Sequence, residues 1–133
     1  MHQTLGSVTL LVRDYDEAIR YFTGVLGFTL VEDTPVTPEK RWVRVAPPGA
    51  TECGLLLARA RTTAEHAAVG NQAGGRVLFF LQTDNFARDY PALKHRGVAF
   101  SESPRQEDYG QVAVFTDLYG NRWDLIQPRP GLR

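Results

Sequence analysis

Apolar and polar positions along the chain predict a definite order of strands and helices. Residues 7–12 form a nearly continuous apolar run, which is typical of a buried strand. Asp14 follows as a helix cap with Glu17 three positions on, and Gly27 stands after the last apolar residue of a helical pattern. Further strands are predicted over residues 28–31, 41–46 and 54–58, with a polar loop over residues 32–40. The first half of the chain therefore predicts the order β-α-β-β-β.

The same order of elements returns in the second half. A strand is predicted over residues 77–81, a helix after Asp84 that ends at Gly97 with a kink or break near Tyr90 because of Pro91, a strand over residues 98–100, and a closing hairpin. Three pairs of landmarks are each separated by 70 positions: Asp14 and Asp84, Gly27 and Gly97, Gly54 and Asp124. The repeat predicts one α+β domain over residues 1–133, with module one at 5–59, a connecting loop at 60–75 and module two at 76–128.

The closing hairpin leaves one carboxylate in an unusual position. Residues 111–116 and 122–127 have strand composition, and Gly120 and Asn121 between them are expected to adopt positive φ. Because side chains alternate along a strand, Trp123 and Leu125 are expected to face the core, and Asp124 the other side of the sheet. We expect the charge of Asp124 to stay partly hydrated there.

Composition excludes several classes of partner. The chain has 133 residues, 15 basic and 15 acidic, so no net field attracts nucleic acid or an anionic membrane. The single cysteine, Cys53, excludes an internal disulfide, the first residues do not resemble a signal peptide, and no apolar run is long enough to span a bilayer. We expect a cytoplasmic protein that has no nucleic-acid or membrane partner.

These elements and motifs resemble a known superfamily. The two β-α-β-β-β units contain three motifs: Val8-x-Leu-x-Val-x-Asp14, Leu26-Gly-Phe28 and Asp117-Leu-Tyr-Gly-Asn-Arg-Trp-Asp-Leu125. In these units and motifs, the chain resembles the vicinal oxygen chelate superfamily of glyoxalases, fosfomycin- and bleomycin-resistance proteins and ring-cleaving dioxygenases. The resemblance covers nearly the whole chain. It implies curved mixed sheets that form a half-open cup in each module. It also implies a homodimer in which cups are completed across modules or chains.

In metal-using members of that superfamily, ligands stand on the first and last strands of each module. The resemblance places Ser7, Gly54, Val77 and Asp124 at these positions, and of the four only Asp124 is a firm ligand. Divalent transition metals need three or four protein donors, so we expect no metal and no other cofactor. His2, His66 and His95 are expected to be solvated, and Cys53 to be a small buried thiol.

The remaining residues predict a cup that binds a small, partly apolar organic molecule. Its expected ligand-binding residues, on strand faces and edges, are Ser7, Trp42, Arg44, Gly54, Val77, Phe79, Tyr109, Arg122 and Asp124. The neutral net charge argues against a strongly cationic cargo of the bleomycin type. Two alternatives stay open: a lyase, isomerase or dioxygenase that uses Asp124 as a base or in a non-standard metal site, and an interaction domain without a ligand. A salt bridge from Asp124 to Arg44 or Arg122 is an equally open interpretation of that carboxylate.

Overall fold

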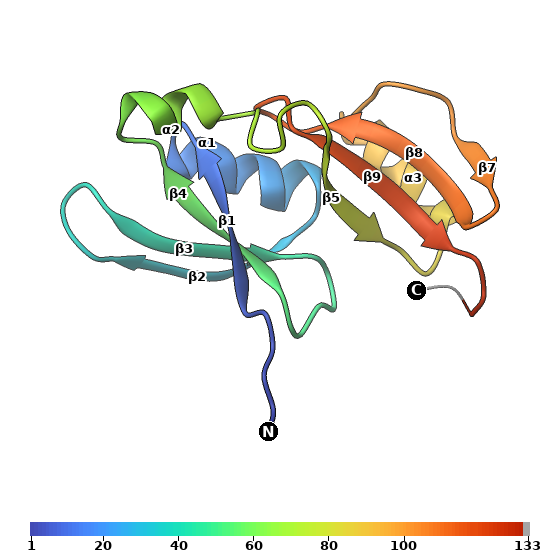
Figure 1. Ribbon diagram of the computed structural model, residues 1–133, viewed down its shortest axis with the longest axis horizontal. Coiled ribbons are helices and arrows are strands. Elements are labelled where there is room, and N and C mark those ends of the chain that lie inside the picture. Colours follow the sequence, from blue (N-terminus) through green and yellow to red (C-terminus); the bar gives the residue numbers. More distant parts are fainter. Residues whose placement is uncertain (132–133) are drawn as a thin grey trace. The chain divides into compact units, whose positions relative to one another are not determined.

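The computed structural model describes residues 1–131 and separates into two compact units, Met1–Gly70 and the residues from Asn71 onward. Each unit contains a mixed sheet with at least one helix (Figure 1). The predicted α+β class with two such modules is confirmed. No helix among residues 1–131 is long and apolar enough to cross a membrane.

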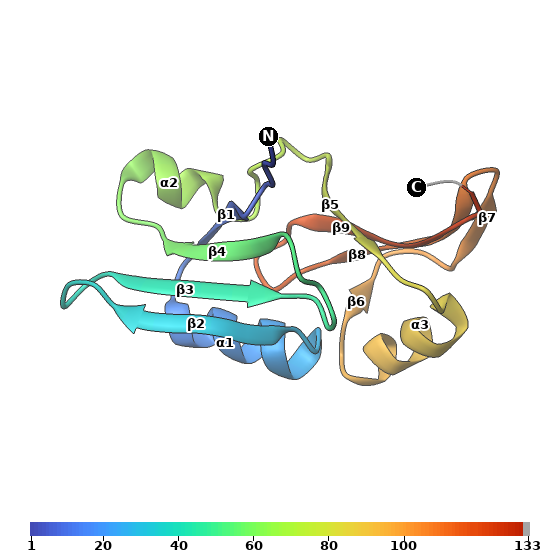
Figure 2. The same ribbon diagram turned by 90° about the horizontal axis from the view of Figure 1, so that it is seen from below.

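The first unit has a four-stranded sheet in the order β1-β4-β3-β2, in which β1 runs parallel to β4 and the other neighbours are antiparallel. Helix α1 packs against β3 and β4, on one face of this sheet (Figures 1 and 2). The elements in chain order are β1 (Ser7–Val12), α1 (Tyr15–Arg20) continuing into the π-helical turn η1 (Tyr21–Val25), β2 (Thr29–Pro35), β3 (Arg41–Ala46), β4 (Gly54–Arg59) and α2 (Thr63–Ala68).

Alternation along these strands sorts the side chains onto two faces. Leu10, Val43, Val45 and Leu57 are fully or almost fully buried, and with Phe22 of η1 they form the core of the first unit. The intervening residues of β1, β3 and β4 point to the other face. That face includes several residues expected to bind ligand, so the fold of the first unit positions them together.

The second unit has a five-stranded sheet in which β5-β9-β8-β6 are successive neighbours and β7 also pairs with β8. β5 runs parallel to β9, and β8 pairs with β9 in a long antiparallel hairpin. The elements in chain order are β5 (Val77–Gln82), α3 (Phe86–His95), β6 (Ala99–Phe100), β7 (Arg105–Glu107), β8 (Gly110–Thr116) and β9 (Arg122–Pro128).

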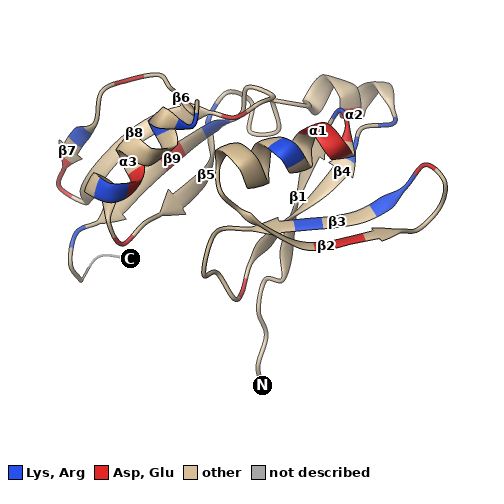
Figure 3. Ribbon diagram, turned by 180° about the vertical axis from the view of Figure 1, so that it is seen from behind, with Lys and Arg blue, Asp and Glu red and all other residues tan. Residues whose placement is uncertain are grey.

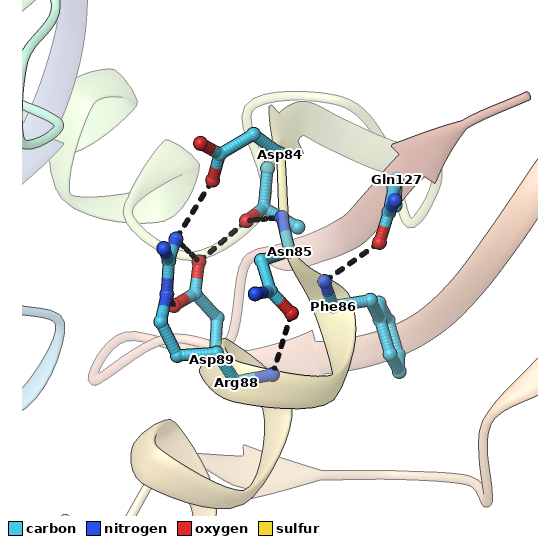
Figure 4. A network of polar contacts seen from close by, with 7 residues as sticks. Asp84, Asn85, Phe86, Arg88, Asp89 and Gln127 are labelled. Atoms are coloured by element: carbon cyan, nitrogen blue, oxygen red, sulfur yellow. Dashed lines mark hydrogen bonds and ion pairs between the residues drawn. The ribbon is translucent and has the colours of Figure 1, made fainter. Parts of the chain in front are cut away.

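The core of the second unit lies between β9 and helix α3. Trp123 and Leu125 of β9 are 2% and 1% exposed, and Phe86 and Leu93 of α3 are buried with them. The start of α3 is tied to the end of β9, because the backbone N–H of Phe86 donates a 2.7 Å hydrogen bond to Oε1 of Gln127 (Figure 4). The face of β9 that carries Asp124 is therefore the face away from the helix.

Both helix starts and helix ends follow the sequence closely, with one correction. Asp14 caps α1 by accepting a 2.8 Å hydrogen bond from the N–H of Glu17, and Gly27 and Gly97 have φ of 76° and 101°, as expected of helix terminators. The cap of α3 is Asn85 rather than Asp84, and its side chain accepts from the N–H of Arg88 (Figure 4).

Some predictions about local structure are wrong. Helix α3 runs through Pro91 without a break, so of the predicted kink or break the break is wrong. Among residues 1–131 only glycines have positive φ, so Gly120 adopts it in the β8–β9 turn and Asn121 does not. Strand β2 extends to Pro35 through a bulge, into residues predicted as a loop. The predicted connecting loop, 60–75, contains helix α2, which is capped by Thr62.

Candidate functional site

Asp124 is a buried carboxylate on the sheet face opposite the core of the second unit. It lies on β9 between Val114 of β8 and Phe80 of β5, and it is 8% exposed. Its Oδ1 is buried without a hydrogen-bond partner in the described part of the chain. The orientation predicted from alternation is correct, and Asp124 is more buried than the expected partial hydration suggested, although 8% of the residue stays exposed.

Burial raises the pKa of Asp124 above its ordinary value, because removal from water penalises the charged form. The nearby positive charge of Arg105 lowers the pKa, the negative charge of Glu102 raises it, and Arg122 lowers it again, but burial dominates. No basic side chain in the described part of the second unit forms an ion pair with Asp124 within 4.0 Å. The salt bridge to Arg122 that was considered from the sequence is therefore not formed, and Arg44 belongs to the other unit.

Arg105 on β7 does not neutralise Asp124 because its own hydrogen bonds go elsewhere. Its Nε donates to Glu102 at 2.9 Å and its Nη1 to Glu107 at 2.7 Å. Tyr109, one of the predicted ligand-binding residues, lies in the turn between β7 and β8 and is 40% exposed. The two carboxylates raise the pKa of the guanidinium, with a further contribution from Tyr109, and their hydrogen bonds hold it beside the Asp124 face.

A register shift in β5 changes which aromatic residue adjoins Asp124. The pairing of β5 with β9 shifts between Val77 and Phe79, so Val77 lies opposite Arg122, Phe79 opposite Trp123, and Phe80 opposite Asp124. Phe79 therefore packs on the helix-facing side, with its ring centroid 4.8 Å from that of Trp123. The predicted cup position of Phe79 is wrong for this reason.

Phe80 takes the position expected of Phe79 and is 63% exposed. The apolar run Val77-Leu-Phe-Phe-Leu81 gives no sign of the extra residue in β5. The constant 70-residue spacing of the repeat gives no sign of it either. Arg122, which was expected to bind ligand, is exposed, and its Nη1 donates a 3.2 Å hydrogen bond to the carbonyl of Gly75. The face of the second unit near Asp124 thus combines one buried acceptor with an exposed aromatic ring.

The first unit brings four predicted residues together on its own open face. Ser7 lies opposite Gly54 in the β1–β4 pair, and Arg44 of β3 donates a 2.9 Å hydrogen bond from Nε to the hydroxyl of Ser7. Trp42, two residues before Arg44 and on the same face, is 39% exposed. Ser7, Trp42, Arg44 and Gly54 are therefore near neighbours, as the strand pattern predicted.

Residues 4–125 match the family model described as the Glyoxalase/Bleomycin resistance protein/Dioxygenase superfamily. The chain belongs to this superfamily. An uncharacterized protein of Shewanella frigidimarina is 52% identical over 128 residues, which cover 96% of this chain and 95% of that protein.

Solved structures of the superfamily fold agree with the match. The crystal structure of UcmS2 has a TM-score of 0.82 and 29% identity, and the alignment covers 95% of this chain and 98% of that chain. The crystal structure of TnmS3, an antibiotic binding protein from Streptomyces sp. CB03234, has a TM-score of 0.77 and 30% identity, with 96% and 98% coverage.

The superfamily positions that hold metal in other members do not fit a divalent cation here. In the first unit the guanidinium of Arg44 reaches the Ser7–Gly54 pair, and a fixed positive charge opposes a cation. In the second unit Asp124 adjoins Phe80, and Arg105 and Arg122 already act on its charge. Within residues 1–131, no three His, Cys, Asp or Glu side chains gather as a metal site. The prediction of a metal-free protein remains a prediction.

The residues considered as substitute ligands lie at the surface. His2, His66 and His95 are exposed, as expected, although His66 lies on helix α2 rather than in a loop. Cys53 is also exposed, so its prediction as a buried thiol is wrong. It directly precedes β4, where the chain leaves the polar turn after Pro47.

Proposed function

We propose that this protein binds small, partly apolar organic molecules without a metal, and that each unit offers its own open sheet face for this: the face that carries Asp124 in the second unit and the face that carries Arg44 in the first. The observation that supports this most is the buried, unpartnered Oδ1 of Asp124. An unsatisfied buried acceptor costs about 1–3 kcal/mol, and a ligand hydroxyl or N–H that reaches the carboxylate where the residue is 8% exposed would remove this cost by donating to it. The exposed rings of Phe80 and Trp42 offer apolar surface to the same kind of molecule.

The comparison with TnmS3 supports the same class of function, because that relative is an antibiotic binding protein at 30% identity over nearly the whole chain. The proposal does not extend to the identity of its ligand. The balanced charge of this chain favours a neutral or weakly charged cargo over a strongly cationic one.

The proposal also includes the assembly and the location of the protein. Exposed apolar residues on β2 and β5, namely Leu30, Val31 and Phe80, favour a homodimer. The single cysteine and the neutral charge favour a cytoplasmic protein without nucleic-acid or membrane partners.

Ligand binding is tested by a thermal-shift screen of small aromatic alcohols, amides, amines and acids, followed by calorimetry on each hit. Asp124→Ala is expected to weaken binding of hydroxyl-bearing hits about tenfold, which corresponds to about 1.4 kcal/mol. Asp108→Ala is the matched control, because Asp108 is an exposed aspartate of the same unit. The proposal fails if no compound binds, or if both variants bind every hit as tightly as the unmodified protein.

A second candidate function is proton-transfer catalysis, as in a lyase or isomerase, and the raised pKa of Asp124 favours it. A carboxyl group whose pKa is shifted towards neutrality is a better acid or base at physiological pH than an ordinary aspartate. Each hit is therefore incubated with the protein in D2O, and solvent deuterium at its carbon positions is measured by mass spectrometry. Exchange that is lost in Asp124→Asn supports catalysis, whereas binding without exchange supports the leading proposal.

A further inference from the structure

Arg44 is held in a defined position by neutral partners. From β3 its side chain reaches β1, where Nε donates to the Ser7 hydroxyl at 2.9 Å and Nη2 to the Gly6 carbonyl at 3.3 Å. The residue is partly buried. A guanidinium has five N–H donors, so these two bonds leave further N–H groups for another acceptor.

The charge of Arg44 is not balanced by a carboxylate of the first unit, residues 1–70. Three other arginines each pair with two acidic residues: Arg41 with Asp16 and Asp33, Arg88 with Asp84 and Asp89, and Arg105 with Glu102 and Glu107. For Arg44, no acidic oxygen of its own unit, residues 1–70, lies within 4.0 Å.

Glu32 of β2 is the acidic residue directly opposite Arg44 in the sheet. Its carboxylate accepts a 3.2 Å hydrogen bond from the hydroxyl of Thr34 and forms no ion pair with the guanidinium. Figure 3 shows basic residues on β3 beside acidic ones on β2, yet the ion pair between these strands is formed by Arg41 and Asp33. Arg44 therefore has a fixed position and an unpaired charge.

Gly54 makes room for this arrangement. A Cβ at position 54 would stand 2.9 Å from the carbonyl oxygen of Val45 and 3.5 Å from Nη2 of Arg44. The first distance is shorter than real Cβ contacts, and the second places a side chain directly against the guanidinium. Because Gly54 has no side chain, the guanidinium of Arg44 can extend over β4 and reach Ser7 on β1.

The neighbours of Arg44 on the same face are apolar. Leu56 of β4 lies beside it in the strand register, and the exposed ring of Trp42 precedes it by two residues on β3. A cation next to an aromatic ring and a leucine matches a molecule with an acidic group attached to a flat apolar body.

We propose that Arg44, positioned by Ser7 above Gly54, binds the carboxylate or ionised phenol of a planar apolar organic acid. This inference rests on the proposed function and specifies the chemistry of its ligand. Arginine suits such a group because its planar N–H groups bind two oxygens at once. Ser7 acts as a positioning residue, since it holds Nε and does not supply charge.

The test uses 2-naphthoate and its neutral counterpart 2-naphthylmethanol, with dissociation constants measured by calorimetry at low and high salt. The unmodified protein is expected to bind naphthoate at least tenfold more tightly than the alcohol, and to lose much of that preference at high salt. Arg44→Gln is expected to remove the preference and leave alcohol binding unchanged, while Arg44→Lys retains part of it. Ser7→Ala is expected to lower the preference severalfold.

Arg20→Gln is the matched control, because it removes the same charge from an exposed position on helix α1. Each variant is checked for its melting temperature before binding is measured. Equal binding of both probes, or a preference that survives Arg44→Gln, overturns this inference alone. If neither probe nor any compound of the screen binds, this inference and the proposed function fall together.

Discussion

The indole N–H of Trp123 donates a 3.0 Å hydrogen bond to the carboxylate of Asp117, across the turn that joins β8 to β9. The same buried carboxylate accepts from the backbone N–H groups of Tyr119 and Asn121, both at 3.0 Å, and from the side-chain amide of Asn121. Asp117 therefore has a structural role. It stabilises the β8–β9 turn and positions the ring of Trp123, the residue before Asp124, in the core.

Removal of this acceptor is expected to destabilise the protein strongly. Asp117→Ala leaves several buried donors without a partner, and we expect a loss of roughly 2–4 kcal/mol in the free energy of unfolding. Urea denaturation measures it. Asp108→Ala, at an exposed position, is expected to stay within about 0.5 kcal/mol of the unmodified protein. Similar losses in the two variants would contradict the structural role of Asp117.

The order of elements and the orientation of Asp124 were predictable because both depend on simple periodicity. Alternation along β9 places Trp123 and Leu125 in the core and Asp124 on the other face, as observed. The burial of Asp124 was not predictable, since it depends on the strands on either side, β5 and β8, and β5 pairs through a register shift that the sequence does not show.

Other errors came from local irregularities that leave no trace in composition. The register shift in β5 moves Phe79 to the core side and Phe80 to the side of Asp124, because one extra residue reverses the alternation. Asn121 was expected to adopt positive φ in the turn, whereas it does not, and instead both its backbone N–H and its side-chain amide bind Asp117. Strand β7 is three residues long and polar, so no apolar pattern indicates it.

Asp124 is expected to make the protein less stable as pH rises. Its folded-state pKa is raised above the ordinary value of 3.8, so above pH 3.8 the folded state holds more protons than the unfolded chain, and stability falls as pH rises through the window up to the raised value. Asp124→Asn cannot ionise. We expect it to gain on the order of 1 kcal/mol relative to the unmodified protein between pH 4 and neutral pH. Urea denaturation across that range measures the difference, and two parallel stability curves would refute the prediction.

Asp89 is expected to behave in the opposite way. The hydrogen bond from Arg88 lowers its pKa, burial opposes this, and the bond from the Thr83 hydroxyl lowers it further. The stabilisation is present above the ordinary pKa of 3.8 and is lost as pH falls through the lowered value. Asp89→Asn should therefore cost about 0.5–1 kcal/mol at neutral pH and nothing in strong acid. Circular dichroism during acid titration tests this, and a cost that persists at low pH would indicate a packing defect instead.

The assembly in solution is expected to be a homodimer. Leu30, Val31 and Phe80 are exposed apolar residues on strands, and Phe80 lies on β5, at an edge of its sheet. Light scattering after size exclusion is expected to give twice the 14.9 kDa of the chain at micromolar concentration. Phe80→Lys tests whether this edge takes part. A mass of one chain in the unmodified protein would exclude the dimer and leave the fold intact.

The purified protein is expected to contain no stoichiometric transition metal. At Ser7 and Gly54, a bound divalent ion would be repelled by the positive charge of the neighbouring Arg44 guanidinium. At Asp124, it would be repelled by the positive charges of Arg105 and Arg122. Elemental analysis after expression with added Zn, Ni, Mn and Fe measures the content. Each ion is then added to chelator-treated protein, because an ion at 100 times its dissociation constant adds about 2.7 kcal/mol to a folded state that binds it. We expect no such gain in melting experiments. One equivalent of bound metal would contradict the prediction. A gain of that size that is lost in Asp124→Ala would show that Asp124 is one of the metal ligands.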